Sequence, residues 1–315
     1  MQTFHRSVIH VSIQVNELLR HAIRARFLHA KHAGARNRKK ANTPSLDATT
    51  CRRSKVGSSN WLNTLKKVEH ASLTILFFHY AGGNSGVYRS LSKLISTDVH
   101  IVAVEMPGRA KRFTEPPIDN MEVVAECIAS ALHDARATLP SNDLVFFGHS
   151  VGAKIALAVA QTISQKNALK LRKLIASGSR APHLPRKGPT LHDLPQAEFI
   201  NELRNYGGTP AAILEDSDLL ELLTPMLRSD FKLAENHQRH TSQPIACDIH
   251  VFGGAQDAMV ETDLLDAWSM HTVGRCDVKL FSGGHFFLHD DERNVAIAID
   301  HILASVRHEL QAGKV

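Results

Sequence analysis

A Gly-x-Ser-x-Gly motif centred on Ser150 is the segment of this sequence best suited to covalent chemistry. An apolar run at residues 144–147 precedes it and an alanine-rich run at residues 153–160 follows it, which predicts a strand, a tight turn and a helix. Such a turn leaves no room for side chains at Gly148 and Gly152, and it lifts the serine hydroxyl above the sheet edge. Ser150 is therefore the candidate nucleophile. The alternative is an ordinary turn serine.

A serine hydroxyl needs a base to accept its proton and a carboxylate to orient that base. In folds that carry a nucleophilic serine in such a strand–turn–helix, the carboxylate and then the histidine follow the serine along the chain. Each lies in a loop just after a strand. Asp257 and His285 each follow an apolar run in that order. We predict Asp257 as the orienting carboxylate and His285 as the general base. The alternatives are a helix-capping role for Asp257 and the neighbouring carboxylates Asp263 and Asp266.

The glycine-rich run after the predicted strand 73–78 meets a further requirement, which is hydrogen-bond donors for the oxyanion of a tetrahedral intermediate. One donor in this fold is the backbone N–H of the residue after the nucleophile, here Val151, and the other comes from the loop after an early strand. Two glycines let that loop fold back, so we predict the Ala81 N–H, or that of Tyr80, as the second donor. The alternative is a loop that merely turns the chain.

The other histidines and the cysteines show no spacing typical of metal ligands. His149 adjoins the serine and should point away from it, packed or facing solvent, and His289 is expected to be structural. The cysteines are scattered, with no Cys-x-x-Cys, which indicates a reducing compartment. They are Cys51, Cys127, Cys247 and Cys276. We therefore expect no metal, no cofactor and a cytoplasmic protein.

The rest of the chain alternates short apolar runs with helical runs. Strands are predicted at 73–78, 100–104, 144–147, 173–177, 248–252 and 277–281, and helices at 85–96, 119–138, 151–165, 261–270 and 292–310. This alternation predicts an α/β fold with a mostly parallel sheet covered by helices on both faces. Helical runs at 196–205 and 217–236 interrupt it within residues 185–240. We predict a helical lid there, the alternative being additional core helices.

Six motifs follow one another in order along the chain. They are Phe-Phe-His-Tyr-Ala-Gly-Gly (77–83), Met-Pro-Gly-Arg (106–109), Glu-Pro-Pro (115–117), Gly-His-Ser-Val-Gly (148–152), Gly-Gly-Ala-Gln-Asp (253–257) and Gly-Gly-His-Phe-Phe-Leu (283–288). Together with lid-like stretches at 194–199, 206–210 and 227–231, they resemble the type II thioesterases, which are stand-alone α/β-hydrolases that accompany non-ribosomal peptide and polyketide synthases. The resemblance covers residues 60–305. It implies hydrolysis of acyl thioesters on the phosphopantetheine arm of a carrier protein, without a cofactor.

Two positions depart from the pattern of that family. His79 stands where proline is usual, and Ala110 stands where glycine is favoured. Neither is a member of the predicted triad. The imidazole of His79 is expected near the site, and it could be packed, substrate-facing or idle.

Other functions use the same residues. A small-molecule carboxylesterase or lipase and a medium-chain fatty acyl thioesterase would need the same triad, and so would a thioesterase that releases a cyclic product. A non-catalytic binding protein is the least favoured alternative, because all three triad residues are present.

The charge of the chain is unevenly distributed. Residues 1–67 hold 14 Lys and Arg against 2 Asp and Glu, a net charge of +12, whereas residues 68–315 hold 23 against 29, a net charge of −6. The predicted catalytic domain, 68–315, is thus mildly acidic, which argues against nucleic acid as its partner. We expect no membrane span, because no apolar run is long enough, and a monomer.

Residues 1–67 form the predicted N-terminal extension, which is basic and lacks clear periodicity over most of its length, so we expect disorder. It is interpreted as a start-site artefact, with translation beginning near Val56, as a basic arm that docks a synthase, or as a transit-type presequence.

Within the domain, a basic rim beside the site is a candidate docking surface for an acidic carrier protein, the alternative being solvated surface. The rim consists of Arg109, Lys111, Arg112, Arg180, Arg186 and Lys187.

Overall fold

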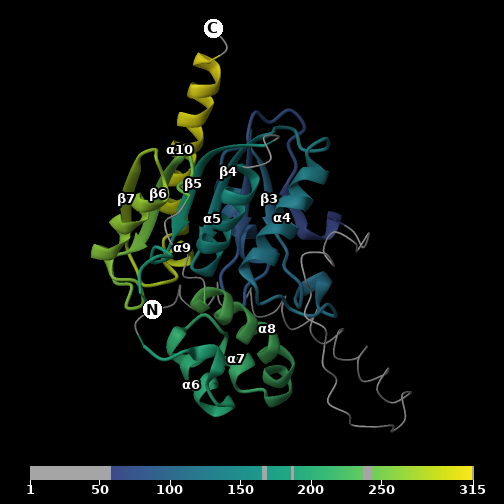
Figure 1. Cartoon of the computed structure of the whole chain (residues 1–315), viewed down its shortest axis with the longest axis vertical. Coiled ribbons are helices and arrows are strands. Elements are labelled where there is room, and N and C mark those ends of the chain that lie inside the picture. The colour runs from purple at the N-terminus through teal and green to yellow at the C-terminus, as the bar shows by residue number, and fades with distance from the viewer. Residues whose placement is uncertain (1–57, 165–168, 186–187, 237–242, 314–315) are drawn as a thin grey trace.

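A seven-stranded sheet forms the centre of the molecule, with strand order β1-β3-β2-β4-β5-β6-β7 (Figure 1). The computed structural model describes residues 58–164, 169–185, 188–236 and 243–313. The strands are β1 (Leu62–Lys66), β2 (Thr74–Phe78), β3 (His100–Val104), β4 (Asp143–His149), β5 (Lys170–Ser177), β6 (Asp248–Gly254) and β7 (Cys276–Phe281). β1 pairs antiparallel with β3, and all other neighbouring strands are parallel. The predicted α/β architecture is confirmed.

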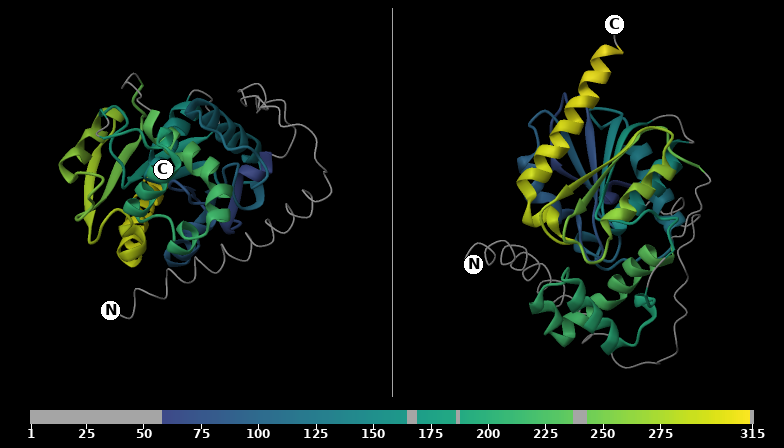
Figure 2. Two further views of the ribbon diagram at one scale, coloured as in Figure 1. Left: turned by 90° about the horizontal axis from the view of Figure 1, so that it is seen from below. Right: turned by 90° about the vertical axis from the view of Figure 1, so that its left-hand side faces the viewer.

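Helices cover both faces of the sheet (Figure 2). The α-helices are α3 (Arg89–Leu94), α4 (Met121–Ala135), α5 (Val151–Ser164), α6 (Gln196–Tyr206), α7 (Ala211–Leu214), α8 (Ser217–Asn236), α9 (Phe287–Asp290) and α10 (Glu292–Ala312). Short 3-10 helices are η1 (Ser58–Trp61), η2 (Ser85–Tyr88), η3 (Ala110–Arg112), η4 (Leu191–Asp193) and η5 (Thr262–His271). α4 and α5 pack on one face of the sheet, and α3 and α10 pack on the other.

The two hydrophobic cores follow from the alternation of side chains along each strand. On β2, Leu76 and Phe78 face the core shared with α4 and α5, whereas Ile75 and Phe77 face the core shared with α3 and α10. All four side chains are buried. A strand buried on both faces reads as a continuous apolar run, which is why this strand could be predicted from the sequence.

A helical insertion lies between β5 and β6. It contains η4, α6, α7 and α8, and its apolar side chains form a hydrophobic cluster of their own. In Figures 1 and 2 these helices lie together at one end of the sheet. They occupy the segment predicted as a lid, and side chains from them line a pocket together with the loops after β2, β4 and β7.

Several boundaries differ from those predicted. Residues 62–66 were assigned to the N-terminal extension but form β1, an edge strand with half-buried side chains, and Lys66 donates hydrogen bonds to the carbonyls of Ile95 and Ser96. The charge distribution groups Lys66 with the basic extension, whereas in the structure its amine binds backbone carbonyls of the domain. The predicted helix 261–270 is the 3-10 segment η5. Residues 1–57, with all three interpretations of the extension, lie outside the described residues.

Two further expectations can be compared with the structure. Cys247 and Cys276 are free thiols, but Cys127 is disulfide-bonded, so the argument from unpaired cysteines does not hold for Cys127. Within the described residues, no helix combines the length and the apolar character that a membrane span needs.

Candidate active site

Ser150 occupies a strained turn between β4 and α5. Its φ of 55° lies in the left-handed region, which a serine rarely adopts, and its N–H donates to the Ser177 carbonyl at 2.8 Å. A Cβ on Gly148 would lie 2.2 Å from the Gly152 oxygen, and one on Gly152 would lie 2.2 Å from the Phe78 oxygen. The two glycines are therefore required by close backbone approach, as the motif predicted.

Asp257 and His285 come together from the loops after β6 and β7. Nδ1 of His285 lies 2.8 Å from Oδ2 of Asp257, and the side chain of Asp257 is only 1% exposed. The other oxygen, Oδ1, accepts the N–H groups of Met259 and Val260 at 2.8 and 3.1 Å. The carboxylate is fixed by its own loop, so it can hold the imidazole in one orientation and tautomer. Asp263 and Asp266 are not in this pair.

One pocket is lined by both Ser150 and His285, whereas Asp257 is not among its lining residues. Its volume is about 180 Å³, and Ala81, Ser150, Val151 and His285 all line it. The hydrogen bonds of the described residues do not include one between Ser150 and His285. Such contacts are often long in the absence of substrate and tighten when it binds. Ser150 and His285 both line one pocket, which a nucleophile and its general base would require.

The two residues predicted to supply oxyanion donors, Ala81 and Val151, line the same pocket. Val151 is the first residue of α5, so its N–H has no acceptor within the helix. Ala81 lies in a tight turn that is closed by a hydrogen bond from the Gly83 N–H to the Tyr80 carbonyl at 3.0 Å. This turn places Ala81 at the wall of the pocket.

A cluster of aromatic and imidazole rings packs behind His285. The ring of His149 is fully buried, with its centroid 5.0 Å from that of His285, and its Nδ1 lies 2.9 Å from Ser177 Oγ. Burial, and next the charge of His285, holds the pKa of His149 well below its usual range. His289 hydrogen-bonds the Tyr80 hydroxyl at 3.0 Å. Of the two predicted alternatives for His149, packed or solvent-facing, the structure shows the packed one, with the ring beside that of His285.

The structure gives a physical account of both departures from the family pattern. His79 is buried and its Nδ1 contacts the Tyr80 carbonyl at 3.0 Å, so it is packed in the fold. Burial, and next the charge of Arg109, lowers the pKa of His79 to about 4. Ala110 has a φ of 43°, a conformation that glycine adopts without strain.

The predicted basic rim is wrong at two of its positions. Arg109 is 4% exposed and pairs with Asp230 through two contacts of 2.8 Å. Arg112 is also buried: it pairs with Glu115 at 2.6 Å and lies over the Trp61 ring at 4.2 Å. A sequence shows charge but not burial, and both arginines satisfy acceptors inside the fold. Lys111 is exposed and Arg180 lines the pocket, whereas Arg186 and Lys187 lie outside the described residues.

Asp230 is a residue of this region that the sequence analysis missed. It accepts the N–H of Gly82, next to Ala81, at 2.8 Å, in addition to its pairing with Arg109. One signal was available. Asp230 falls on the same face of α8 as Leu223, Met226 and Leu227, so it interrupts an apolar stripe where a charge needs a partner.

No group of three or more side chains able to hold a metal ion occurs among the residues that the structure describes.

The family follows from comparison with known proteins. The family model described as Thioesterase domain matches residues 73–305. This chain belongs to the thioesterase family. Thioesterase PikA5 from Streptomyces venezuelae is 31% identical to it over 254 residues, 79% of this chain and 88% of PikA5. The structure of BorB, a type II thioesterase from the borrelidin biosynthetic cluster, matches with a TM-score of 0.67 and 27% identity, covering 76% of this chain and 95% of BorB. The resemblance to type II thioesterases and the α/β-hydrolase fold are confirmed.

One relative carries a different name. The protein named linear gramicidin dehydrogenase LgrE, from Brevibacillus parabrevis, is 35% identical over 255 residues, 79% of this chain and 95% of LgrE. The dinucleotide-binding fingerprint of a dehydrogenase begins Gly-x-Gly, and no Gly-x-Gly occurs in this sequence. The glycine-rich turns of this thioesterase instead carry Ser150 and His285.

Proposed function

We propose that this thioesterase hydrolyses acyl thioesters carried on the phosphopantetheine arm of a carrier protein, with Ser150, His285 and Asp257 as a catalytic triad. The observation that carries the proposal is the 2.8 Å Asp257–His285 contact beside a pocket that Ser150 also lines. The strained φ of Ser150 supports it, because strain of this kind gathers at functional sites.

In the first half of the reaction, Ser150 Oγ attacks the thioester carbonyl while Nε2 of His285 accepts the hydroxyl proton. The Val151 and Ala81 N–H groups donate to the oxyanion of the tetrahedral intermediate. Asp257 stabilises the imidazolium that forms. When the intermediate collapses, the C–S bond breaks and His285 returns the proton to the departing thiolate, which leaves an acyl ester on the serine.

In the second half, water replaces the carrier thiol. His285 accepts a proton from the water as its oxygen attacks the acyl ester, and the same two N–H groups bind the new oxyanion. The C–O bond to the serine then breaks, and His285 returns the proton to Ser150 Oγ. The products are a carboxylic acid and free enzyme, so no cofactor is consumed.

The substrate class is inferred from the pocket and from the relatives. Leucine and aromatic side chains of the lid, among them Leu203, Leu227 and Phe231, line the pocket beside Ser150, which suits an apolar acyl chain. PikA5 is named as a thioesterase and BorB as a type II thioesterase of a biosynthetic cluster. We infer a carrier protein of such a synthase as the partner, and an editing or release role for the reaction.

The test is intact-protein mass spectrometry of an acylated carrier protein before and after addition of the enzyme. We expect loss of the acyl mass with wild type, and a fall in kcat of ~10⁶-fold with Ser150→Ala, by analogy with other triad serines. Ser305→Ala, an exposed serine on α10, is the matched control and should behave as wild type. Ser150→Ala turnover near that of wild type would refute the assignment of the nucleophile.

A second assay separates this function from its alternative. If turnover of nitrophenyl esters of the same acyl chain exceeded that of the acylated carrier protein, a small-molecule carboxylesterase would be the better description. Detection of a macrocyclic product instead of the free acid would indicate cyclising release.

A further inference from the structure

The loop that carries the Ala81 amide is held by a buried ion pair that spans the core and the lid. Asp230 of α8 accepts the Gly82 N–H at 2.8 Å through Oδ2. Arg109, from the loop after β3, donates to both oxygens of Asp230 at 2.8 Å, and its Nη1 also donates to the Gly83 carbonyl at 3.0 Å. The loop is thus bound at an N–H and at a C=O on consecutive residues just after Ala81.

These contacts lie inside the protein. The side chains of Arg109 and Asp230 are 4% and 2% exposed. Hydrogen bonds between charged groups are stronger and more directional than neutral ones, and burial protects them from screening by salt. Gly82 has a φ of 75°, and a Cβ there would lie 2.9 Å from Leu227 Cδ2, so the loop already lies against α8. The pair therefore fixes the loop in one position.

We propose that the Arg109–Asp230 pair is a positioning device for the oxyanion hole, which it holds by fixing the Gly82 N–H and the Gly83 C=O so that the Ala81 N–H points into the pocket. The inference rests on the proposed function, because it concerns the donor for the reaction described above. Neither side chain is among those that line the pocket, so both act through the loop.

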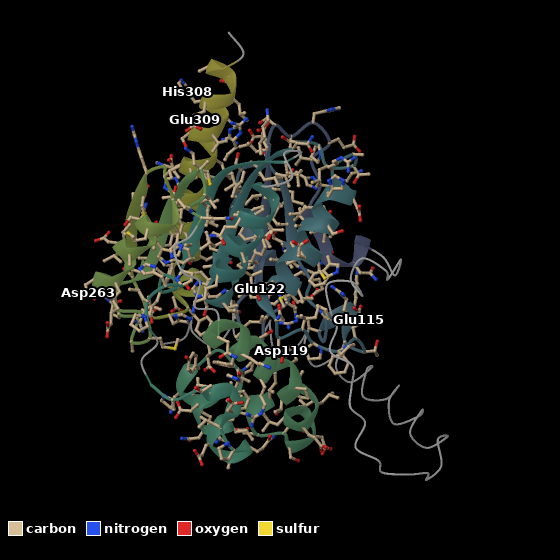
Figure 3. The ribbon with its side chains drawn as sticks, viewed as in Figure 1. Glu115, Asp119, Glu122, Asp263, His308 and Glu309 are labelled. Atoms are coloured by element: carbon tan, nitrogen blue, oxygen red, sulfur yellow. The ribbon has the colours of Figure 1, made fainter. Side chains whose placement is uncertain are left out.

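A consequence is that α8 belongs with the catalytic core more than with a moving lid. Besides Asp230, the carbonyl of Ala234 accepts a hydrogen bond from Lys154 of α5 at 2.7 Å, and Lys232 pairs with Asp119 at 2.6 Å. Figure 3 shows Asp119 at the border between the core and the lid. A movement of α8 that opened the pocket would therefore pull the oxyanion loop with it, because Asp230 of α8 is bound to Gly82.

Two variants test the proposal on the full chain. Asp230→Asn keeps the shape of the side chain but removes the charge that holds Arg109. The double variant R109M/D230L replaces the buried pair by apolar side chains, a change that folded proteins often tolerate without loss of stability. The matched control, K232M/D119N, removes the exposed ion pair that α8 makes with the core and touches neither the loop nor the pocket.

The quantities to measure are kcat and KM on an acylated carrier protein and the affinity for a trifluoromethyl ketone analogue. This ketone forms a tetrahedral oxyanion on the serine. Loss of one oxyanion donor lowers kcat by ~10²–10³-fold, so a misplaced donor should lower it by about 10- to 100-fold. We expect this fall in kcat for both Asp230→Asn and R109M/D230L. KM should stay within about twofold of wild type, and affinity for the ketone should fall in parallel with kcat. The control should equal wild type.

Three results for folded Asp230→Asn or R109M/D230L protein would overturn the proposal. They are an unchanged kcat, a rise in KM alone, or a fall in kcat with full affinity for the ketone. If instead the proposed function were wrong, wild-type enzyme itself would leave the acylated carrier protein intact. The two failures can therefore be distinguished.

Discussion

Because buried His79 is neutral in the folded state, the free energy of unfolding of this thioesterase should depend on pH. We expect His79→Asn to remove that contribution. In the folded state, burial and then the charge of Arg109 lower the pKa of His79 from 6.5 to about 4, against opposing effects of Asp230 and the Tyr80 carbonyl. In the unfolded chain the imidazole titrates near its ordinary pKa. Between these two values the unfolded state binds one more proton than the folded state, so the free energy of unfolding falls as the pH falls.

The size of this effect follows from the shift. One pKa unit corresponds to about 1.4 kcal/mol, so lowering the pH from 7 to 4 should remove about 3 kcal/mol of stability through His79 alone. The loss begins near pH 6.5 and is complete below about 4. That amount is a large fraction of the ~5–15 kcal/mol that stabilises a typical protein.

The assay is urea unfolding at intervals from pH 7 to pH 4 for wild type and for His79→Asn, whose side-chain amide can donate to the Tyr80 carbonyl in place of Nδ1. We expect the difference in unfolding free energy between the two proteins to shift by about 3 kcal/mol in favour of the variant over this range. His308→Asn, at the exposed position labelled in Figure 3, controls for the loss of a histidine. Parallel pH profiles for wild type and His79→Asn would refute the reasoning.

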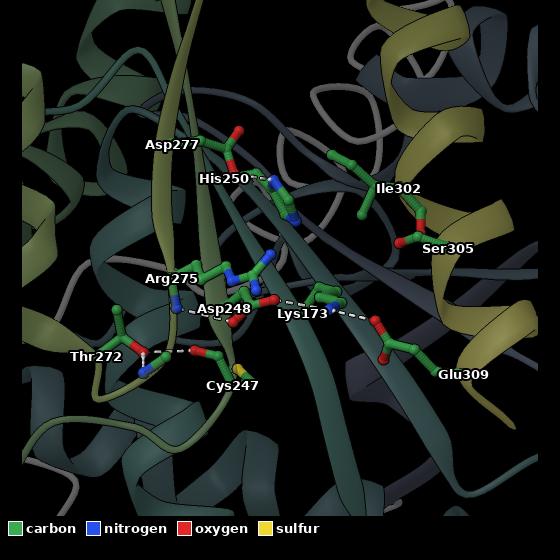
Figure 4. Close-up of polar contacts among 11 residues, drawn as sticks. Lys173, Cys247, Asp248, His250, Thr272, Arg275, Asp277, Ile302, Ser305 and Glu309 are labelled. Atoms are coloured by element: carbon green, nitrogen blue, oxygen red, sulfur yellow. Dashed lines mark hydrogen bonds and ion pairs between the residues drawn. The ribbon is translucent and has the colours of Figure 1, made fainter. Parts of the chain in front are cut away.

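Three further outcomes are expected. Asp257→Asn should lower kcat by ~10⁴-fold, measured on an acylated carrier protein, because the amide favours the wrong tautomer of the base. Ala110→Gly should raise the free energy of unfolding by about 1 kcal/mol, measured in urea, because φ there is positive. Lys173→Met should cost about 1 kcal/mol of stability and leave kcat unchanged, because the lysine pairs at 2.8 Å with Asp248 and Glu309, partly exposed carboxylates away from the pocket (Figure 4). An unaltered kcat in the first variant, or an unaltered stability in either of the others, would contradict these arguments.

The candidate site residues that could be named from the sequence are those to which local rules apply. Ser150, Asp257 and His285 each follow a strand directly and stand beside glycines that a tight loop requires, so each could be recognised within about ten residues of chain. The helical insertion was recognisable for a similar reason, because two amphipathic runs broke an otherwise regular alternation.

The sequence could not predict the contacts that join distant segments. Arg109 and Asp230 are separated by 121 positions, and no local pattern connects them. The sequence alone therefore predicts Arg109 in an exposed rim and gives it no partner. Burial of a charge depends on the partner that the fold supplies, and this is a property of the tertiary structure.

The histidines around the pocket show how one fold gives the same side chain different roles. His79 and His149 are buried and, among the described residues, neither is hydrogen-bonded to a carboxylate; burial lowers the pKa of both, so they remain neutral at pH 7. His285 alone of the three is hydrogen-bonded to a carboxylate. In the proposed mechanism His285 becomes an imidazolium, and a protonated His149, with its ring 5.0 Å away, would repel that charge. Because burial keeps His149 neutral, it favours the proton transfer to His285 that we propose.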